Sequence, residues 1–499
     1  METTTIQLLI LASFLFSILM IFKQAKKSRP NLPPGPPKLP LIGNLHNLIG
    51  GGMPHQAIHQ LALKYGPLMH LKLGGVSTVV VSSPDVARQV MKTHDLNFAS
   101  RPPLLATEIL NYGKSGVIFS PYGESWRHLR KICTLELLSN KRVQSFRPVR
   151  QKVHLELARM IAAGEGSAVD LSSKLYSSTY DVASRVAVGE SNKSRKARLM
   201  EIINEAGELS AGFHIAELYP SIKVLGKITG LEKKLQKLHW ETDELLEGII
   251  GDHREAPEKE DGKKVDDLVD VLLKLQGEEH QSFLTSNSIK SVIMDILGAG
   301  SETSATTLDW AMTELLKNPS VMDRAQREVR AVFDRKGHVN ESDVNELKYL
   351  NSVIKETLRL HTPGPLLVPR MCIEACQING CDIPENTRVI VNAWTINRDP
   401  DYWQDPLSFK PERFLDSAVD YGGDSFEYLP FGAGRRICPG ISFGLANIQS
   451  PLAMLLYHFD WKLPDGMKPE DIDMSEKFGV TTRRLINLRA VPVITRPLP

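Results

Sequence analysis

The strongest chemical signature in this sequence is a single cysteine, Cys438, among the glycines and arginines of residues 431–440 (FGAGRRICPG). Glycines let a backbone bend sharply and approach a flat ligand closely. Arginines beside a thiol favour the thiolate form, which binds metal ions. One cysteine cannot build a tetrahedral zinc site, but it can be the single protein ligand of a haem iron. The alternative is a surface loop that contains a buried structural cysteine.

A second segment, residues 298–304 (GAGSETS), carries groups that could move protons. Each glycine inside a helix costs about 1 kcal/mol relative to alanine. Two glycines beside an acid and an alcohol indicate a local opening, in which missing side chains make room for a ligand. Glu302 and Thr303 could then bring protons to that ligand. For this segment taken alone, a patch of small residues that packs closely against another helix is an equal alternative.

Several charged residues have spacings that suit ion pairs or an acidic ligand. Glu356 and Arg359 are three residues apart, so on a helix they share one face. On most helices such a pair is solvated and contributes little. Trp126 and Arg130 are one helical turn apart, and an indole donor beside a cation suits an acidic group. For each arginine the alternative is an ordinary surface charge.

Taken together, these segments resemble the cytochrome P-450 superfamily, and the plant microsomal enzymes in particular, over essentially the whole chain. The resemblance implies that Cys438 is the axial thiolate ligand of a haem b. It implies that Thr303 hydrogen-bonds the bound dioxygen and that Glu302 relays protons. It places Glu356, Arg359 and Arg413 in a buried salt-bridged knot behind the haem. The residues it assigns to haem binding are Trp126, Arg130, Arg370 and Arg436 at the propionates, and Phe431, Gly432, Gly434 and Gly440 in the cysteine loop.

The resemblance also predicts a substrate pocket built from five separate segments, which span residues 104–119, 211–219, 293–302, 364–368 and 478–482. Most of their side chains are aliphatic or aromatic, which suits an apolar substrate held by shape. We expect about half of them to be ordinary core residues. The pocket residues are Leu105, Ile118, Phe119, Phe213, Ile296, Leu297, Ala299, Leu366, Leu367, Val368 and Val480.

The activity implied by the resemblance is insertion of one oxygen atom of O2 into a C–H or C=C bond. Electrons come from NADPH through a membrane-bound flavoprotein, NADPH–cytochrome reductase, which we expect to dock near Arg127, Lys131 and Arg435. Residues 440–447 and 455–461 are similar to those of terpene-oxidising enzymes, so a sesquiterpene or diterpene is the expected substrate. Alkaloids, phenolics and fatty acids are alternatives. The Glu302–Thr303 pair argues against a haem-thiolate isomerase or lyase, and the complete set of motifs argues against a catalytically silent haem protein.

Composition indicates one large globular unit behind a short appendage. The chain has 499 residues, of which 42% are hydrophobic and 24% charged, and no repeat or Gly/Ser linker divides it. A net charge of +2 argues against a nucleic-acid-binding protein. Five cysteines show no disulfide framework, and Cys372, Cys376 and Cys381 are interpreted as reduced thiols.

The N-terminus predicts a membrane anchor. Residues 6–22 are mostly apolar and are followed by Lys23, Lys26, Lys27 and Arg29, so the positive-inside rule places the remainder of the chain in the cytosol. The alternative, a cleaved signal peptide, would carry its charges before the apolar run. We therefore expect an anchor at residues 1–29, a stiff proline-rich hinge at 30–40 and a catalytic domain at 41–499. The protein would be a single-pass protein of the endoplasmic reticulum membrane.

The helices and strands that would position these residues can be predicted from the periodicity of apolar residues and from the glycines, prolines and capping residues that end an element. We predict a helix near residues 54–65, strands at 68–73 and 76–81, an exposed loop at 252–264 and a helix at 265–276. A long helix should start at Thr285 or Ser286 and end at Asn318, before Pro319. Its length of roughly 48 Å would cross a whole domain. The predicted class is mostly α with a smaller β portion, in the P-450 fold.

Overall fold

The computed structural model describes residues 30–49, 52–113, 115–190, 193–210, 212–255, 265–277, 284–337 and 339–499. The predicted membrane anchor at residues 1–29 lies outside these ranges. Within them, no helix combines the length and the apolar character needed to cross a bilayer. Residues 30–38, in the predicted hinge, form neither helix nor strand.

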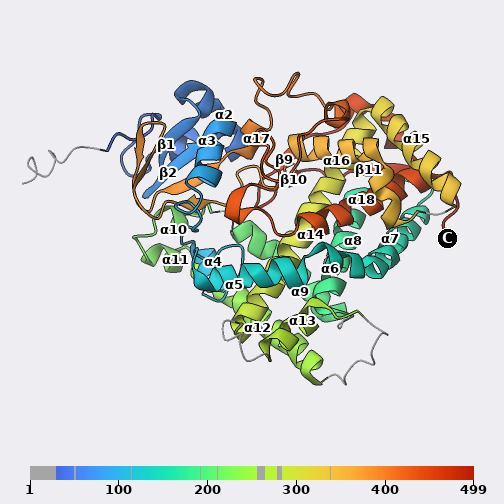
Figure 1. The fold of residues 1–499 in the computed structure, drawn as a ribbon, viewed down its shortest axis with the longest axis horizontal. Helices are drawn as coiled ribbons and strands as arrows, with labels where there is room; N and C mark the ends of the chain where they lie inside the picture. Colours follow the sequence, from blue (N-terminus) through green and yellow to red (C-terminus); the bar gives the residue numbers. More distant parts are fainter. Residues whose placement is uncertain are drawn as a thin grey trace, which may run out of the picture.

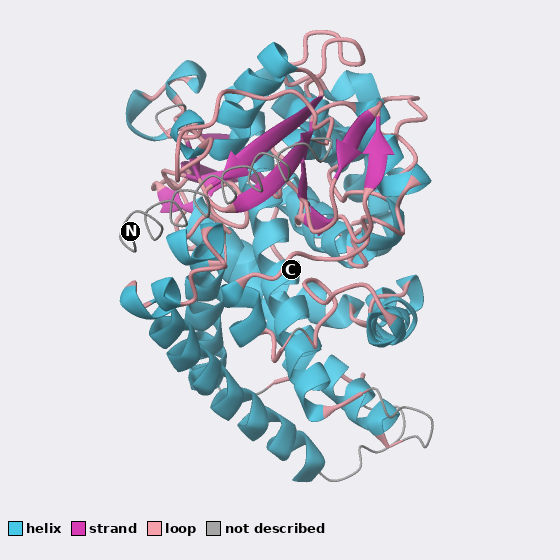
Figure 2. Cartoon of the chain, turned by 90° about the vertical axis from the view of Figure 1, so that its left-hand side faces the viewer, coloured by secondary structure: helices cyan, strands magenta, loops and turns pink. Residues whose placement is uncertain are grey.

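Helices are the main regular structure of the molecule, and short strands form several separate sheets beside them (Figures 1 and 2). The predicted class, mostly α with a smaller β portion, is therefore confirmed. The helices are α2 (Pro54–Tyr65), α3 (Pro84–Arg88), α4 (Leu105–Leu110), α5 (Glu124–Ile132), α6 (Asn140–Ser145), α7 (Arg147–Ala162), α8 (Leu171–Val188), α9 (Lys193–Leu209), α10 (Ile215–Leu218), α11 (Val224–Ile228), α12 (Leu231–Glu255), α13 (Leu268–Gln276), α14 (Ser286–Lys317), α15 (Pro319–Lys336), α16 (Lys348–Leu360), α17 (Ala393–Ile396) and α18 (Ile441–His458).

The largest sheet of the described residues has the strand order β1-β2-β7-β4. The predicted strands form β1 and β2, an antiparallel pair in which Leu68 lies opposite Val81 and Leu73 opposite Val76. The strands of this sheet are β1 (Leu68–Leu73), β2 (Val76–Val81), β4 (Arg370–Met371) and β7 (Arg388–Val391). The smaller sheets contain β3 (Val169–Asp170), β5 (Cys376–Ile378), β6 (Cys381–Ile383), β8 (Phe459–Lys462), β9 (Glu476–Lys477), β10 (Arg483–Arg484) and β11 (Arg489–Ile494).

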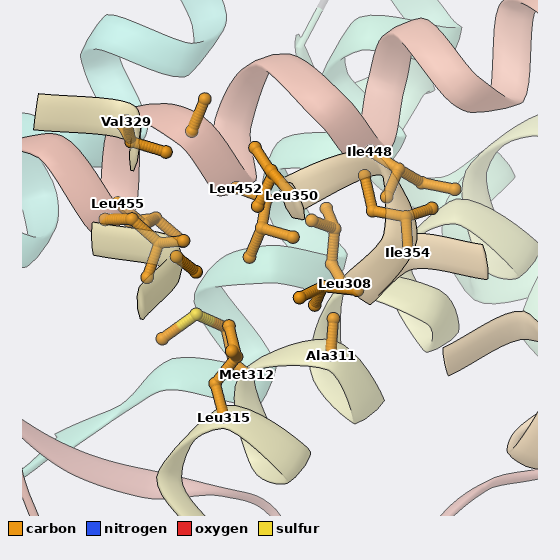
Figure 3. Packing of buried hydrophobic residues seen from close by; sticks show 14 of the residues in the cluster. Leu308, Ala311, Met312, Leu315, Val329, Leu350, Ile354, Ile448, Leu452 and Leu455 are labelled. Carbon is orange, nitrogen blue, oxygen red and sulfur yellow. The ribbon is translucent and has the colours of Figure 1, made fainter. Parts of the chain in front are cut away.

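The long helix α14 runs through the middle of the fold, and its predicted bounds are confirmed (Figure 1). The Thr285 hydroxyl caps it by accepting a hydrogen bond from the Ser288 amide at 3.1 Å. Its C-terminal half is buried against α15, α16 and α18, where apolar side chains from all four helices interlock (Figure 3). Those labelled are Leu308, Ala311, Met312 and Leu315 from α14, Val329 from α15, Leu350 and Ile354 from α16, and Ile448, Leu452 and Leu455 from α18.

The prediction of an exposed loop at residues 252–264 is wrong for its first part, because α12 continues to Glu255. The side chains of Ile249 and Ile250 are buried, which holds this last turn of the helix against the core. His253 also contacts Asp267, with 3.0 Å between Nε2 and Oδ2. Asp267 in turn caps α13, which therefore begins three residues later than the predicted helix at residue 265.

Candidate functional site

Cys438 lies in a tight loop that leads into the N-terminus of α18. The loop is closed by hydrogen bonds from the Cys438 amide to the Phe431 carbonyl, at 3.0 Å, and from the Ile437 amide to the Gly434 carbonyl, at 3.0 Å. Gly432 and Gly434 both have positive φ, 69° and 70°, which other residues adopt only with strain. A side chain at Gly440 would lie 3.9 Å from the Cys438 sulfur. The loop is therefore shaped to present one thiol.

Gly434 is the position at which this loop touches the rest of the protein most closely. A β-carbon there would lie 2.1 Å from the carbonyl oxygen of Met91 and 2.8 Å from Oδ1 of Asp95. The buried Asp95 carboxylate also accepts a hydrogen bond from the Arg435 amide at 2.9 Å. Only glycine fits this contact, so its absence of a side chain fixes the cysteine loop against the segment that contains Met91 and Asp95.

The electrostatic surroundings of Cys438 differ from those predicted. Burial raises the pKa of the Cys438 thiol, and the Gly440 amide and the Arg130 guanidinium act in the opposite direction. Arg130 comes from α5 and donates to the Ile437 carbonyl at 2.7 Å. The flanking Arg435 pairs with Asp95, so the cation that acts on the thiol comes from a distant element. A thiolate here would need a further positive partner, which a metal ion supplies.

Three buried arginines form a cationic cluster beside the cysteine loop. Arg370 pairs with Asp95 at 3.1 Å, and Arg436 donates to the carbonyls of Ala99, Val117 and Ser120. Arg101 donates to the carbonyls of Ile118, Val368 and Pro369. Burial lowers the pKa of Arg436 to about 9 and that of Arg101 well below its usual range, and in both cases a neighbouring arginine of the cluster adds to the shift.

This cluster fits the carboxylates of a haem. Arg436 and Arg101 are bonded to neutral carbonyl groups, and Asp95 pairs with Arg370, so the buried cations exceed the negative charge among their described contacts. Buried cations of this kind are stabilised by an anion, and guanidinium groups suit carboxylates geometrically. A thiol and an excess of buried guanidinium charge are the groups that an iron porphyrin with two propionates requires.

Arg101 was not predicted, and the predicted residue Trp126 contacts another predicted residue, Arg436. The Trp126 indole donates to the Val117 carbonyl at 2.9 Å, and the Arg436 guanidinium lies over its ring, 4.1 Å from the centroid. The role of Trp126 at a propionate stays a prediction. An arginine in the otherwise apolar or small stretch of residues 98–103 (FASRPP) was the one available sequence signal for Arg101.

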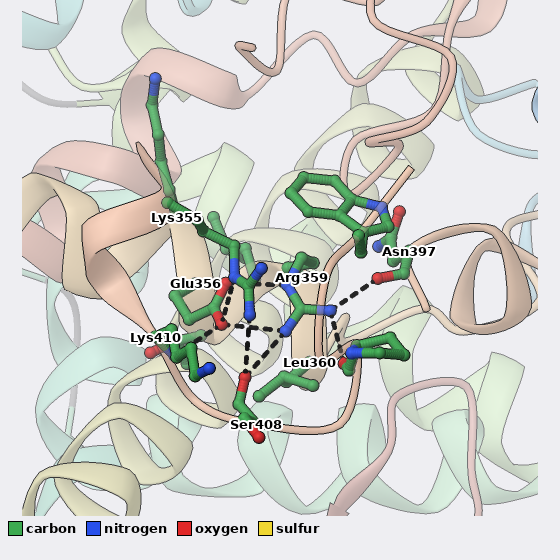
Figure 4. Close-up of polar contacts among 12 residues, drawn as sticks. Lys355, Glu356, Arg359, Leu360, Asn397, Ser408 and Lys410 are labelled. Atoms are coloured by element: carbon green, nitrogen blue, oxygen red, sulfur yellow. Dashed lines mark hydrogen bonds and ion pairs between the residues drawn. The ribbon is translucent and has the colours of Figure 1, made fainter. Parts of the chain in front are cut away.

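The ion pairs predicted for Glu356, Arg359 and Arg413 form in the structure (Figure 4). Glu356 and Arg359, on α16, are both fully buried, and Arg359 Nε lies 2.8 Å from Glu356 Oε2. Arg413 Nε lies 3.0 Å from Glu356 Oε1. Arg359 also donates to the carbonyls of Asn397, Pro406 and Ser408. These contacts therefore tie two segments, one at Asn397 and one from Pro406 to Arg413, to one helix.

Glu302 and Thr303, on α14, have separate partners. The Thr303 hydroxyl donates to the Ala299 carbonyl at 2.7 Å, and Ala299 is exposed although it lies in the middle of a largely buried helix. The Glu302 carboxylate accepts from Arg483 Nε at 2.8 Å and from the Thr481 hydroxyl. It also lines a surface cavity of about 430 Å³, together with Tyr176, Asn204 and Arg483. The hairpin of β9 and β10 therefore holds the acid.

Gly300 contradicts the prediction that both glycines of α14 open space for a ligand. A β-carbon at Gly300 would lie 3.1 Å from the Phe443 ring of α18. The packing alternative holds at this position, because the glycine lets α14 and α18 approach closely. At Gly298 the nearest side-chain atom would be 3.7 Å away, on Ile203, so no such constraint applies there.

The predicted pocket residues divide into three groups by burial. Leu297 is fully buried, and Ile296 and Leu366 are 8% and 9% exposed, so these three serve as core residues. Ala299 and Val480 are exposed, and the others are partly buried. The rings of Phe213 and Phe478, from two predicted pocket segments, are in contact with centroids 5.6 Å apart. The partly buried residues are Leu105, Ile118, Phe119, Phe213, Leu367 and Val368.

Comparison with known proteins gives concordant matches over nearly the whole chain. The family model described as Cytochrome P450 matches residues 33–488. Salviol synthase from Salvia pomifera is 53% identical, over 96% of this chain and 94% of that protein. Tabersonine 6,7-epoxidase isoform 1 from Catharanthus roseus is 50% identical, over 96% of this chain and 95% of that protein. A solved zebra fish cytochrome P450 structure with progesterone matches with a TM-score of 0.75 at 27% identity, over 88% of this chain and 99% of that one.

Proposed function

This chain belongs to the cytochrome P450 family, and from that premise we propose that it hydroxylates or epoxidises a sesquiterpene or diterpene skeleton at a membrane. It is a haem-thiolate monooxygenase with plant relatives. The observation that carries the proposal is the loop of Cys438 beside buried arginines whose charge exceeds that of Asp95.

Haem b, when bound, would supply the iron chemistry that activates dioxygen, and a thiolate ligand favours O–O cleavage. Cys438 would be the iron ligand. Arg101, Arg370 and Arg436 would bind the propionates. Trp126 would hold the Arg436 guanidinium in place through a cation–π contact. Arg130 would hold the loop carbonyl of Ile437 and lower the energy of the thiolate.

Protons for the reaction would pass through Glu302 and Thr303. The overall reaction, RH + O2 + 2 H⁺ + 2 e⁻ giving ROH + H2O, consumes two protons that the apolar pocket does not contain. Since the Thr303 hydroxyl donates to the Ala299 carbonyl, its oxygen remains able to accept a hydrogen bond on the exposed Ala299 face. Glu302 is held by Arg483 and lines a surface cavity, so it can exchange protons with solvent.

A terpenoid substrate is supported by the apolar character of the pocket residues that are not core, among them Ile118, Phe213 and Val480. Relatives of this chain include plant enzymes that oxidise terpenoids and alkaloids. An alkaloid is therefore the second candidate substrate. The expected difference is chemical, because an alkaloid carries a basic nitrogen that would require an acceptor or a carboxylate in the pocket wall.

The electron donor would be NADPH, through a flavoprotein reductase that docks on the face near the cysteine loop. Arg127, Lys131 and Arg435 are exposed there and provide positive charge. A reductase with an acidic surface would be steered to this face. Reversal of these charges should slow the first electron transfer, and an unchanged reduction rate would contradict the docking site.

Attachment to the endoplasmic reticulum membrane is supported by exposed apolar residues in two segments that lie together. Leu41 is 88% exposed in the segment after the hinge, and Ile228 is 73% exposed at the end of α11. The Tyr219 hydroxyl donates to the Leu41 carbonyl at 3.3 Å and so joins the two segments. Ile222 and Val224, which follow Tyr219 in the chain, are 47% and 51% exposed. Exposed apolar side chains that cluster on a surface are typical of a membrane or protein interface.

The test is a carbon monoxide difference spectrum of the reduced protein in microsomes, followed by product analysis. We expect a strongly red-shifted Soret band that Cys438→Ser abolishes and the matched control Cys376→Ser retains. With reductase and NADPH, a terpene panel should give oxygenated products. A band typical of histidine-ligated haem would overturn the site. Conversion of a hydroperoxide without NADPH consumption would favour the isomerase or lyase alternative, and products from alkaloids alone would favour the second substrate.

A further inference from the structure

Asp295 is a buried carboxylate on α14 that neither the motifs nor the proposed chemistry uses. It is 8% exposed and lies one helical turn before Ala299, on the same helix face. Its carboxylate accepts hydrogen bonds from the amides of Val117, at 2.7 Å, and Ile118, at 3.2 Å. It also accepts one from the Asn111 side-chain amide at 3.2 Å. Burial raises the pKa of Asp295 to about 6, although these three hydrogen bonds act in the opposite direction.

The segment that Asp295 holds is the connection between α4 and α5, and its described part lies directly on the helix. A β-carbon at Gly116 would lie 2.4 Å from Oδ2 of Asp295 and 2.5 Å from the Ser291 hydroxyl. Glycine at position 116 is thus what allows two consecutive amides to reach one carboxylate. Two bonds from neighbouring peptide groups fix the orientation of the backbone as well as its distance.

The same stretch of backbone serves the predicted pocket and the cationic cluster. The Ile118 carbonyl accepts from Arg101 at 3.0 Å, and the Val117 carbonyl accepts from Arg436 at 3.2 Å. The partly buried side chains of Ile118 and Phe119 belong to the predicted pocket wall. Asp295 therefore connects the helix that carries Ala299 and Thr303 to the wall across from it.

We propose that Asp295 is a positioning residue that sets the regioselectivity of oxidation by fixing the backbone of Val117 and Ile118 against α14. The inference rests on the proposed function, because a product ratio exists only if the chain oxidises a substrate. Asp295 itself touches no reacting atom. Its effect passes through the peptide groups of Val117 and Ile118, which place the Ile118 side chain relative to the Ala299 face.

The test uses Asp295→Asn in the full haem-loaded protein, with Asp309→Asn as the matched control. Asp309 lies on the same helix, is also buried, has a pKa that burial raises to about 6, and accepts from the Ser172 hydroxyl instead of the loop. Both backbone amides donate to the same oxygen, Oδ2, and asparagine replaces this charged acceptor with a neutral amide oxygen, which forms weaker hydrogen bonds. We expect hydrogen exchange of the Val117 and Ile118 amides to accelerate by at least about ten-fold in Asp295→Asn. The product ratio should change by about two-fold or more.

In Asp309→Asn both quantities should remain at the wild-type values. The inference would be overturned if Asp295→Asn kept the wild-type exchange rates of the two amides and the wild-type product ratio. It would also be overturned if Asp295→Asn and Asp309→Asn changed both quantities equally. If Asp295→Asn fails to fold, Asp295→Glu keeps both acceptors and displaces them by one methylene. It should then alter the product ratio while the amides stay protected, and an unchanged ratio would overturn the inference. Absence of any wild-type product would instead refute the proposed function, because the exchange experiment does not depend on turnover.

Discussion

The two sides of α14 are held together in different ways. On the side of Cys438, fully buried charges and glycines at positive φ leave almost no freedom: Glu356 and Arg359 are completely buried, and Gly434 touches a carbonyl. On the side of the predicted pocket, the contacts are hydrogen bonds to main-chain groups, and the side chains that are not core are only partly covered, as at Ile118 and Val480.

This difference separates the residues that secure folding and haem binding from those that select a substrate. Removing one partner from a buried ion pair strands a charge, so the cysteine side should tolerate few substitutions. An exposed apolar side chain has few contacts to lose, so the pocket side should tolerate many, provided that its backbone is held in place. Substitutions on the two sides should therefore differ in both the size and the kind of their effects.

The largest effect should come from Arg359→Ala, which takes one cation from the buried Glu356 carboxylate and leaves it the Arg413 guanidinium and the Lys410 amide among its described contacts. Loss of one partner in a buried pair typically costs about 3–5 kcal/mol. We therefore expect little haem-loaded protein, measured as the carbon monoxide difference signal per amount of chain. Arg413→Ala should cost less, because Glu356 keeps both contacts to Arg359. Normal haem content in Arg359→Ala would show that the buried ion pairs of Glu356 do not secure haem binding, and would contradict the proposed difference between the two sides of α14.

A smaller but still severe effect is expected from Gly434→Ala compared with Gly432→Ala. Both glycines have positive φ, so each alanine costs about 1 kcal/mol in backbone strain. At Gly434 the new methyl group would also meet the Met91 carbonyl at 2.1 Å, whereas at Gly432 the nearest atom is 3.7 Å away, on Leu367. Thermal unfolding of the two variants should separate strain from clash. Equal melting temperatures would show that the contact with Met91 does not constrain the loop.

An intermediate effect is expected from Arg483→Met, which removes the cation paired with Glu302 and leaves its contact with the Thr481 hydroxyl. If the hairpin positions the acid, the yield of product per NADPH should fall several-fold, with the electrons appearing as hydrogen peroxide instead. Product formation supported by iodosylbenzene, which donates an oxygen atom without any need for protons, should be retained. Lys477→Met is the control on the same hairpin, because Lys477 pairs with the exposed Glu208 and not with Glu302. An unchanged yield in Arg483→Met would exclude this role.

The smallest effect on stability is expected from Val480→Ala on the pocket side. Val480 is 43% exposed, so the free energy of unfolding should change by no more than about 0.5 kcal/mol. The ratio of oxidised products should nevertheless change, because the side chain would contact the substrate. A large loss of stability with an unchanged product ratio would show that Val480 contributes to folding and does not contact the substrate, which would contradict the proposed difference between the two sides of α14.

Local signals in the sequence were sufficient for several elements. Alternation of apolar residues and flanking turn residues placed β1, β2 and α2, and a threonine cap followed by a distant Asn-Pro boundary placed both ends of α14. The pairing of Glu356 with Arg359 also followed from spacing on one helix. These features depend on neighbours within a few residues, where steric and hydrogen-bonding preferences act directly.

The sequence by itself determined which residue could ligate a haem iron, since one cysteine lies among glycines and arginines. Only the tertiary structure decided which charges surround it: Arg130 replaced Arg435 as the nearby cation, Arg101 joined the cluster, Gly300 proved to be a packing residue and Glu302 acquired Arg483. It also brought Asp295 to Val117, 178 residues away along the chain. The physical reason is that burial and the identity of a polar partner depend on segments that meet only after folding, and no local pattern encodes that meeting.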